Sequence, residues 1–280
     1  MRTVELANNI YSSALGFGCA PILGSVDAKT ADNALNIAYD SGVNHFDLAR
    51  SYGYGEAEGF VGKFIKGKRD KVVVASKFGI KANWKAKLLS PVKPLIRSIK
   101  KNRPKEVAPI SVVEDKKGTI ADRFHDRIPL NGEQMRLSLE QSLKALKTDY
   151  VDYFFVHEPL HTLNEFEDLA ATASALKSEG KIRAWGLAYM RSQEHEHEAY
   201  LNRFDVLQFD NSPGALGYDK VVAARGQMPN VIFSPLRGGS KEKSPAQKLQ
   251  QLFKEFPKSV ILCSMFSEKH IRDNAKIAGV

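Results

Sequence analysis

Short runs rich in Val, Ile, Phe or Tyr alternate with longer amphipathic segments along most of the chain. The strand-like runs are 15–18, 44–47, 71–77, 150–156, 182–187, 206–209, 231–234 and 259–263. The segments with helical periodicity are 28–40, 56–66, 131–146, 163–178, 192–202, 218–225, 244–253 and 268–277. Strict alternation predicts parallel strands joined by right-handed crossovers. Eight strands and eight helices predict an α/β fold that closes into a (β/α)8 TIM barrel.

One connection is much longer than this alternation of strands and helices requires. Some 50 residues separate the third strand, which ends near Lys77, from the helix that begins near residue 131, whereas a βα loop normally takes roughly 2–6 residues. We therefore expect one (β/α)8 barrel domain over residues 1–280 with a long insertion after the third strand, the basic loop region 81–130. Long loops of such barrels leave from the C-terminal face, where ligands bind. Residues 1–12 are expected to form a short hairpin at the bottom of the barrel.

The positive charge of the chain is concentrated in this insertion. The formal net charge is +9, and residues 81–120 hold 11 Lys and Arg against three acids. The remaining chain is close to neutral, which excludes a uniformly basic nucleic-acid-binding protein. We expect the basic loop to be a solvated lid, and the first alternative is an anionic substrate held beneath it. A membrane surface or a nucleic acid is the remaining ligand that its charge would suit.

Composition and cysteine usage indicate the surroundings of the protein. Hydrophobic residues make up 43% of the chain, which excludes disorder of the whole chain. No apolar run approaches the roughly 18 residues of a membrane span, and the first residues show no apolar secretory segment. The two cysteines, Cys19 and Cys263, make no disulfide framework, so we expect a cytoplasmic protein. Nothing in the sequence indicates the oligomeric state.

Polar side chains follow three consecutive strands at the point where each strand ends. Asp47 ends the second strand, Lys77 ends the third and His157 follows the fourth, while Tyr52 lies in the turn after Asp47. The C-terminal strand ends of a (β/α)8 barrel surround its active site. We therefore expect these four side chains to meet in one pocket. Any one of them alone would have an ordinary structural role, such as a cap, a solvated charge or a packing contact.

Five segments on these strands and turns resemble the aldo-keto reductase family: NHFDLARSYGYGEAE (44–58), VVVASKFG (72–79), SLKALKTDYVDYFFVHEP (142–159), VIFSPLRGG (231–239) and EKHIRDN (268–274). The resemblance extends over about residues 10–80 and 133–276 and leaves out the insertion. It implies a TIM barrel and an NAD(P)H-dependent oxidoreductase that reduces an aldehyde or ketone to an alcohol, or runs the reverse reaction. The implied partner is a small-molecule carbonyl or alcohol substrate, whose identity the sequence does not show.

The chemistry of the four residues agrees with that implication. Hydride addition to a carbonyl carbon places negative charge on oxygen, which needs a proton donor and hydrogen bonds. Tyr52 is the implied donor, and a phenol has a reference pKa of about 10. An ammonium at Lys77 is expected to lower that pKa. Asp47 would hold the ammonium charged, and His157 would donate a hydrogen bond to the carbonyl oxygen.

The cofactor that the resemblance implies is NADP, with NAD left open, lying across the mouth of the barrel. No GxGxxG turn follows the first strand, so a Rossmann site is not indicated. Gln208 matches the residue that faces the nicotinamide carboxamide, and Phe233 matches the aromatic residue that stacks on the ring. The pyrophosphate loop is matched by Ser234, Leu236 and Gly238, and the adenine side by Asp273 and Asn274. The full set of expected cofactor-binding residues is Gly18, Asp47, Gln208, Phe233, Ser234, Leu236, Gly238, Ser264, His270, Asp273 and Asn274.

Two departures from the family pattern concern this cofactor. Ala188 and Tyr189 stand where the family commonly has Ser-Asn beside the carboxamide. His270 stands at the usual position of an arginine for the 2′-phosphate, with Lys269 and Arg272 as nearby substitutes. Because arginine binds phosphate in a bidentate way that other residues do not reproduce, the preference between NADP and NAD is left undecided.

Two other functions remain open. A Schiff-base lyase would use Lys77 as its nucleophile, although Asp47 opposes this by keeping the amine charged. A redox-sensing regulatory protein would bind the cofactor, turn over slowly and use the basic insertion for docking. No metal site is expected. The tract His195-Glu196-His197 is not interpreted as one, because residues two apart on a helix do not share a face.

Overall fold

The protein closes eight parallel strands into a barrel. The computed structural model describes residues 1–7, 9–89 and 124–279. The barrel strands are β3 (Leu15–Gly18), β4 (His45–Asp47), β5 (Val73–Phe78), β8 (Val151–His157), β9 (Ile182–Tyr189), β10 (Val206–Asp210), β11 (Asn230–Phe233) and β12 (Val260–Cys263). Each of these strands pairs in parallel with the next, and β12 pairs with β3 to close the ring. The (β/α)8 barrel predicted from the alternation is confirmed.

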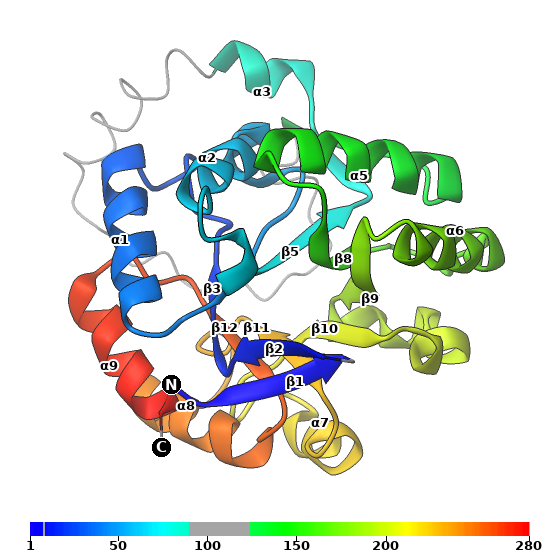
Figure 1. Ribbon diagram of the computed structural model, residues 1–280. Helices are drawn as coiled ribbons and strands as arrows, with labels where there is room; N and C mark the ends of the chain where they lie inside the picture. Colours follow the sequence, from blue (N-terminus) through cyan, green and yellow to red (C-terminus); the bar gives the residue numbers. More distant parts are fainter. Residues whose placement is uncertain (8, 90–123, 280) are drawn as a thin grey trace.

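Helices surround this ring of strands (Figure 1). They are α1 (Ala28–Asp40), α2 (Ala57–Phe64), α5 (Gly132–Leu146), α6 (Phe166–Ser178), α7 (Tyr218–Arg225), α8 (Pro245–Glu255) and α9 (Glu268–Ala278). Apolar residues at spacings of three and four form the face of α1 that packs inward, and they are Ala31, Ala34, Leu35 and Ala38. Asn131 caps α5 by accepting a hydrogen bond from the Gln134 backbone N–H (2.9 Å).

The segment after β9 differs from the prediction. The helix expected over 192–202 is instead a pair of 3-10 helices, η5 (Arg191–Glu196) and η6 (Glu198–Arg203). Between them His197 has φ −120° and a buried side chain, and its Nδ1 is 2.7 Å from the Tyr200 hydroxyl. The two 3-10 helices meet at His197, so a continuous helix does not form.

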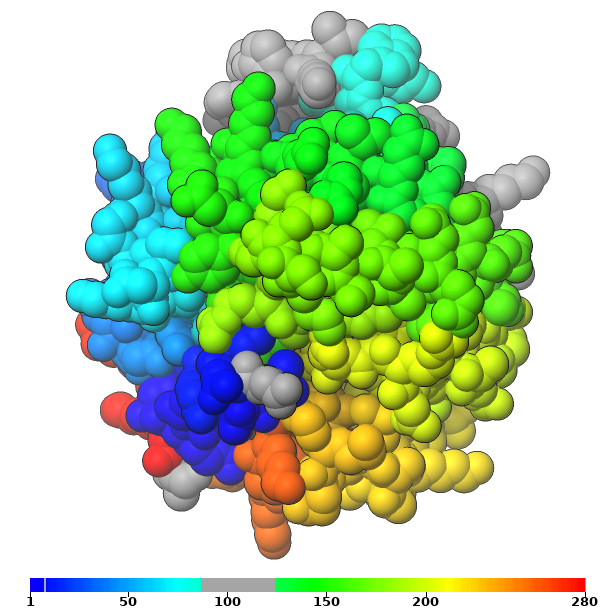
Figure 2. Space-filling model, turned by 45° about the vertical axis from the view of Figure 1, so that its right-hand side comes forward, coloured from blue at the N-terminus to red at the C-terminus, as the bar shows by residue number. Residues whose placement is uncertain are grey.

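A hairpin lies over the N-terminal ends of the strands. β1 (Thr3–Ala7) and β2 (Ile10–Ser13) pair antiparallel, as expected for residues 1–12. The Ser13 backbone N–H donates to Asn44 Oδ1 (2.6 Å) just before β4, and Arg183 near the start of β9 donates to the Asn9 carbonyl (2.8 Å). Figure 2 shows the hairpin in dark blue, surrounded by light-blue, green, yellow and orange segments. The hairpin therefore covers the bottom of the barrel, opposite the face that carries the site.

A buried carboxylate ties the strands together at this lower end. Asp152 on β8 is buried and accepts three hydrogen bonds, each 2.8 Å long, from Arg69, from Arg183 and from the Val74 backbone N–H. The three donors come from β5, from the segment before it and from β9. A buried charge is tolerated when hydrogen bonds and counter-charges replace its hydration.

We expect Asp152→Asn to lower the free energy of unfolding by about 3 kcal/mol, because it leaves two guanidinium groups without their shared counter-charge. Chemical denaturation measured by circular dichroism checks this value. Asp149→Asn is the matched control, since Asp149 is exposed two residues before β8 begins. Equal stability of the two variants would show that the Asp152 network does not hold the barrel together.

The long insertion is described only at its two ends. β6 (Ile80–Ala82) pairs antiparallel with β7 (His125–Arg127), with Ile80 opposite Arg127, and α3 (Trp84–Leu89) follows β6. The insertion therefore leaves and rejoins the barrel side by side, above the end of β5. Most of the basic cluster predicted within 81–130 lies outside the described residues. Of the part of the chain that is described, no helix combines the length and apolarity needed to cross a membrane.

Candidate active site

The C-terminal ends of neighbouring strands place three polar side chains at one face of the barrel. Asp47 is the last residue of β4, His157 is the last of β8, and Lys77 lies one residue before the end of β5. β5 runs between the other two strands, and because all three are parallel their C-terminal ends share this face. Tyr52 begins the 3-10 helix η1 (Tyr52–Gly55) in the loop that follows β4.

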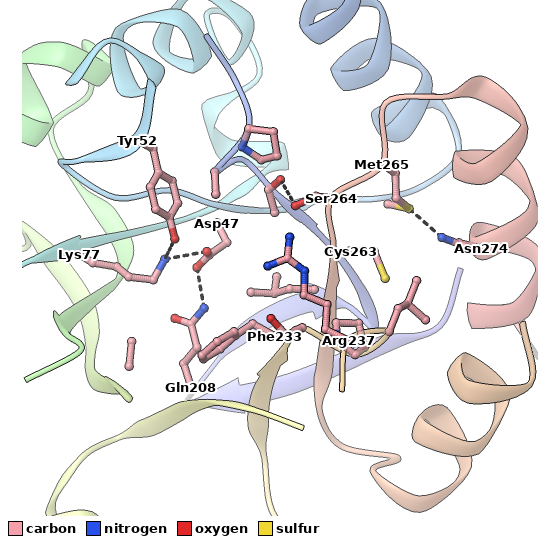
Figure 3. Close-up of a pocket in the computed structure, with 18 of the residues that line it drawn as sticks. Asp47, Tyr52, Lys77, Gln208, Phe233, Arg237, Cys263, Ser264, Met265 and Asn274 are labelled. Carbon is pink, nitrogen blue, oxygen red and sulfur yellow. Dashed lines mark hydrogen bonds and ion pairs between the residues drawn. The ribbon is translucent and has the colours of Figure 1, made fainter. Parts of the chain in front are cut away.

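The Lys77 side chain links Asp47 and Tyr52 (Figure 3). Its Nζ donates to Asp47 Oδ2 (2.6 Å), to the Leu48 carbonyl (2.7 Å) and to the Tyr52 hydroxyl oxygen (3.4 Å). Asp47 also accepts from Gln208 Nε2 (3.1 Å). Both members of the ion pair are buried, and such a pair needs further hydrogen bonds of this kind to be stable. Three acceptors thus surround the Lys77 Nζ, which leaves it little freedom to approach a carbonyl carbon as a nucleophile.

The turn that carries Tyr52 requires glycine. Gly53 and Tyr54 both have φ 61°, in the left-handed region that glycine tolerates best. A Cβ added to Gly53 would lie 2.5 Å from the Ile22 carbonyl oxygen, so no larger residue fits there without a shift of the backbone. This tight turn leads directly into α2.

A second network fastens the same turn to β5. Arg50 forms an ion pair with Glu58, whose carboxylate is buried. Glu58 also accepts a hydrogen bond from the Ser76 hydroxyl (2.7 Å). Ser76 directly precedes Lys77 on β5. These contacts therefore hold the loop with Tyr52 against the strand with Lys77. A phenol whose position is fixed in this way loses little entropy when it reacts.

The pKa of Tyr52 corrects an expectation from the sequence. Burial raises the pKa of its phenol well above the usual value, and the negative charges of Asp47 and Glu158 add to the rise. The lowering expected from Lys77 is wrong, because the ammonium is already paired with Asp47 and desolvation outweighs it. Tyr52 therefore remains protonated at neutral pH, which is the form that a proton donor requires.

His157 completes the group. Its ring lies edge-on to that of Tyr52, with centroids 6.0 Å apart and planes at 80°. Burial lowers the pKa of His157 well below the usual value, and the charges of Lys77 and Arg127 add to this, so the ring is neutral at pH 7. Its Nδ1 is buried without a hydrogen-bond partner in the described residues. A proton on Nδ1 would have no acceptor there, so the neutral ring favours an N–H on Nε2.

A pocket of about 500 Å³ opens at this face of the barrel. Twelve of the residues expected at the site line it: Gly18, Asp47, Tyr52, Lys77, His157, Gln208, Phe233, Ser234, Leu236, Ser264, His270 and Asn274. The structure does not place Gly238 or Asp273 in its lining. Asp273 instead accepts a hydrogen bond from Lys269 (2.6 Å) on the outer face of α9, and Gly238 lies beyond the part of its loop that reaches the pocket.

The pocket offers features that fit a nicotinamide. Gln208 is buried, and its Nε2 donates a hydrogen bond to Asp47. Its Oε1 is buried without a hydrogen-bond partner in the described residues. An unsatisfied buried carbonyl is costly, and the N–H of a carboxamide would satisfy it. The half-buried ring of Phe233 lines the same pocket. Ala188 lines it too, whereas the Tyr189 hydroxyl donates away from it, to Glu194 (3.2 Å).

A close backbone approach shapes the opposite wall. Gly18, at the end of β3, accepts a hydrogen bond at its carbonyl from the Ser264 hydroxyl (3.0 Å). A Cβ at Gly18 would lie 2.9 Å from that hydroxyl, so glycine keeps this part of the pocket open. On α9, Asn274 lines the pocket and donates to Met265 Sδ (3.2 Å).

Two charged residues of the pocket were missed from the sequence, Arg237 and Glu158. Figure 3 shows the Arg237 side chain extending from the loop after β11 into the pocket. Arg237 makes no ion pair with any described residue. The sequence signal was present, since Arg237 lies between two expected pyrophosphate-loop residues and Glu158 directly follows His157.

Lys269 and Arg272, the two residues considered as substitutes for the missing arginine, form ion pairs outside the pocket. Lys269 pairs with Asp273 (2.6 Å) and Arg272 pairs with Glu268 (2.8 Å), both as exposed contacts along α9. Neither lines the pocket. Exposed ion pairs of this kind are weak. Within the described pocket lining, the free guanidinium belongs to Arg237. Among the described residues, no group of three or more His, Cys, Asp or Glu side chains is placed to hold a metal ion.

Comparison with known proteins identifies the family. The model of the "Aldo/keto reductase family" matches residues 14–208, and the chain belongs to this family. The aldo-keto reductase YhdN of Bacillus subtilis is 32% identical over 185 residues, which cover 64% of this chain and 44% of that protein. The NADH-specific methylglyoxal reductase of Escherichia coli is 27% identical over 193 residues, which cover 66% and 49%. The chain thus spans about half the length of the curated relatives that it matches.

Solved structures agree on the fold. The crystal structure of an aldo-keto reductase from Klebsiella pneumoniae in complex with NADPH superimposes with a TM-score of 0.68 at 20% identity, covering 100% of this chain and 90% of that chain. At this level of identity the likeness supports the barrel and its topology. The family membership rests on the sequence match, and the resemblance to the family is confirmed. Three of the five motifs lie within the matched residues, and those at 231–239 and 268–274 lie outside them.

Proposed function

We propose that the protein is an NAD(P)H-dependent oxidoreductase that reduces an aldehyde or ketone to an alcohol, or runs the reverse reaction, with Tyr52 as proton donor. The observation that carries this proposal is the contact chain Asp47–Lys77–Tyr52, with His157 edge-on to the phenol, in one pocket. Family membership supports it. One relative is named a methylglyoxal reductase and another a D-threo-aldose 1-dehydrogenase, and both names describe redox chemistry at a small carbonyl or alcohol compound.

The four side chains have distinct roles in this proposal. The bound dinucleotide would supply the hydride. Tyr52 donates its hydroxyl proton to the carbonyl oxygen as negative charge develops there, and the Nε2–H of His157 donates a hydrogen bond to the same oxygen. After transfer the phenolate lies 3.4 Å from the Lys77 ammonium, which stabilises it. Asp47 keeps Lys77 charged and oriented.

The residues of the pocket also support a dinucleotide. The Oε1 of Gln208 would accept from the carboxamide, and Phe233 would contact the face of the nicotinamide ring. The loop with Ser234 and Leu236 would hold the pyrophosphate, and His270 and Asn274 would lie on the adenine side. One structural neighbour was crystallised with NADPH and one relative is named NADH-specific, so NADP is proposed first and NAD second.

The test is direct. Purified protein is mixed with NADPH or NADH and a panel of aldehydes, and the loss of nicotinamide absorbance is followed. Turnover with at least one aldehyde supports the proposal. Tight cofactor binding without turnover across the panel would favour the redox-sensing alternative, and absence of dinucleotide binding would contradict both.

We expect Arg237→Gln to weaken dinucleotide binding about tenfold, because a hydrogen bond between charged groups in a partly enclosed site is worth more than a neutral one. Titration of protein fluorescence with NADPH and with NADH measures both dissociation constants. A loss for NADPH alone places the guanidinium at the 2′-phosphate, and equal losses place it at the pyrophosphate. Arg272→Gln is the control, because Arg272 lies outside the pocket. Unchanged binding of both nucleotides would remove Arg237 from the cofactor site.

A further inference from the structure

Glu158 occupies an unusual backbone position at the edge of the pocket. It follows His157 directly at the end of β8 and has φ 44°, in the left-handed region that favours glycine. Its backbone N–H donates to the Ala188 carbonyl (2.7 Å), and its own carbonyl accepts from Arg127 (2.6 Å). The backbone is thus held on both sides in a conformation that glutamate does not prefer. Such strain persists where the surroundings enforce it, and it concentrates at functional sites.

Glu158 lines the pocket together with Tyr52 and His157. Its carboxylate makes no hydrogen bond or ion pair within the described parts of the chain. The other carboxylate of the pocket lining, Asp47, is neutralised by Lys77 at 2.6 Å. The negative charge of the Glu158 carboxylate contributes to the raised pKa of the Tyr52 phenol. Burial raises the pKa of Glu158, and the charges of Lys77 and Arg127 oppose that rise. Arg127 is exposed and does not line the pocket. Among the described lining residues, Glu158 is therefore the carboxylate beside the proton donor that has no counter-charge in contact with it.

The free positive charge of the pocket lies elsewhere. Arg237 comes from the loop after β11, whereas Glu158 follows β8, three strands away around the barrel. The pocket is therefore polarised, with a guanidinium on the side of the loop after β11 and a carboxylate on the side of the phenol. An anionic dinucleotide matches the first side, and the second side is left to the substrate.

We propose that Glu158 determines substrate class: it favours carbonyl compounds that carry a cationic group, such as a protonated amine, and it disfavours those that carry a carboxylate. This inference rests on the proposed function, since it concerns the substrate of the same site. It is opposite in sign to the anionic substrate that the basic insertion left open. The physical reason is that a carboxylate facing a partly desolvated pocket attracts a cation and repels an anion.

The test uses three benzaldehydes of similar shape with a trimethylammonium, a nitro or a carboxylate group in the para position. The wild-type protein is expected to show the highest kcat/KM for the cationic aldehyde and the lowest for the anionic one. Glu158→Gln keeps the shape and removes the charge, so it should raise kcat/KM for the anionic aldehyde and lower it for the cationic one, each by about tenfold. The neutral aldehyde reports any change that all three share, because Glu158 also raises the pKa of the proton donor Tyr52, and the effects on the charged aldehydes are read relative to it.

A second measurement needs no turnover. Benzyltrimethylammonium and benzoate are titrated into the protein loaded with NADP⁺, and binding is followed by calorimetry. The wild-type protein is expected to bind the cation more tightly, and Glu158→Gln should abolish that preference. Glu133→Gln is the matched control, since Glu133 is an exposed carboxylate in the first turn of α5. Thermal unfolding of each variant verifies that it is folded.

The outcomes separate this inference from the proposed function. Equal effects of Glu158→Gln on all three aldehydes, or a wild-type preference for the anionic one, would overturn the role of Glu158 while leaving the reductase intact. If no aldehyde is reduced but the cation preference in binding depends on Glu158, the proposed reaction fails and the recognition of a cation stands. If binding shows no charge preference, Glu158 does not select the ligand.

Discussion

Replacing Tyr52 with phenylalanine is expected to lower kcat for aldehyde reduction by at least about a hundredfold, because general acid catalysis by a positioned group contributes on that scale or more. Phenylalanine keeps the ring, and with it the edge-on contact with His157. The change removes the hydroxyl group that Lys77 contacts at 3.4 Å. The dissociation constant for NADPH should be unchanged, since the residues expected to hold the cofactor remain in place.

Single-turnover mixing of the NADPH-loaded protein with an aldehyde, together with a fluorescence titration, separates these two quantities. Tyr54→Phe is the matched control: it removes a hydroxyl group from the same tight turn, and the Tyr54 ring contacts Phe124 and does not line the pocket. Full activity in Tyr52→Phe would assign the proton donor elsewhere. A parallel loss in Tyr54→Phe would point to the turn itself rather than to the phenol.

The second large effect is expected from Lys77→Met. This change leaves the buried Asp47 carboxylate without its counter-charge, and removing one partner of a buried pair costs about 3–5 kcal/mol of stability. Turnover should be lost as well, because the phenolate formed after proton transfer would lack the neighbouring ammonium. Chemical denaturation measures the first effect and steady-state kinetics the second. Lys71→Met, at an exposed lysine just before β5, is the control.

A double variant separates the structural and chemical roles of Lys77. Asp47→Asn combined with Lys77→Met removes both charges, so the unpaired carboxylate no longer destabilises the fold. We expect this variant to recover most of the lost stability and to remain inactive. Unchanged stability in Lys77→Met alone would mean that the pair contributes little. Recovery of turnover in the double variant would exclude Lys77 from the reaction.

The strands and their order followed from the sequence because their signals are local. Runs of β-branched residues at regular intervals, separated by helices long enough for a crossover, allow few arrangements. The same regularity predicted that Asp47, Lys77 and His157 lie at one face, since parallel strands end together. The failure at 192–202 is of a different kind: the segment has helical periodicity, but it forms two 3-10 helices that meet at the buried His197.

The loops were less predictable than the strand ends. Gly238 and Asp273 matched a family pattern, yet the structure keeps both out of the pocket lining and brings in Arg237 and Glu158 instead. The direction of the Tyr52 pKa was also wrong from the sequence. Proximity to Lys77 was foreseen correctly, but the degree of burial and the competing charges were not.

Taken alone, the sequence determined the barrel, its family and the side chains that gather where the strands end, because periodicity and strand direction are properties of short stretches of chain. Only the tertiary structure decided which loop residues enter the pocket, how Lys77 divides its hydrogen bonds and which charge is left free beside Tyr52. These three features depend on burial and on distances between segments far apart in the chain, because burial sets the desolvation energy and distance sets the Coulomb energy.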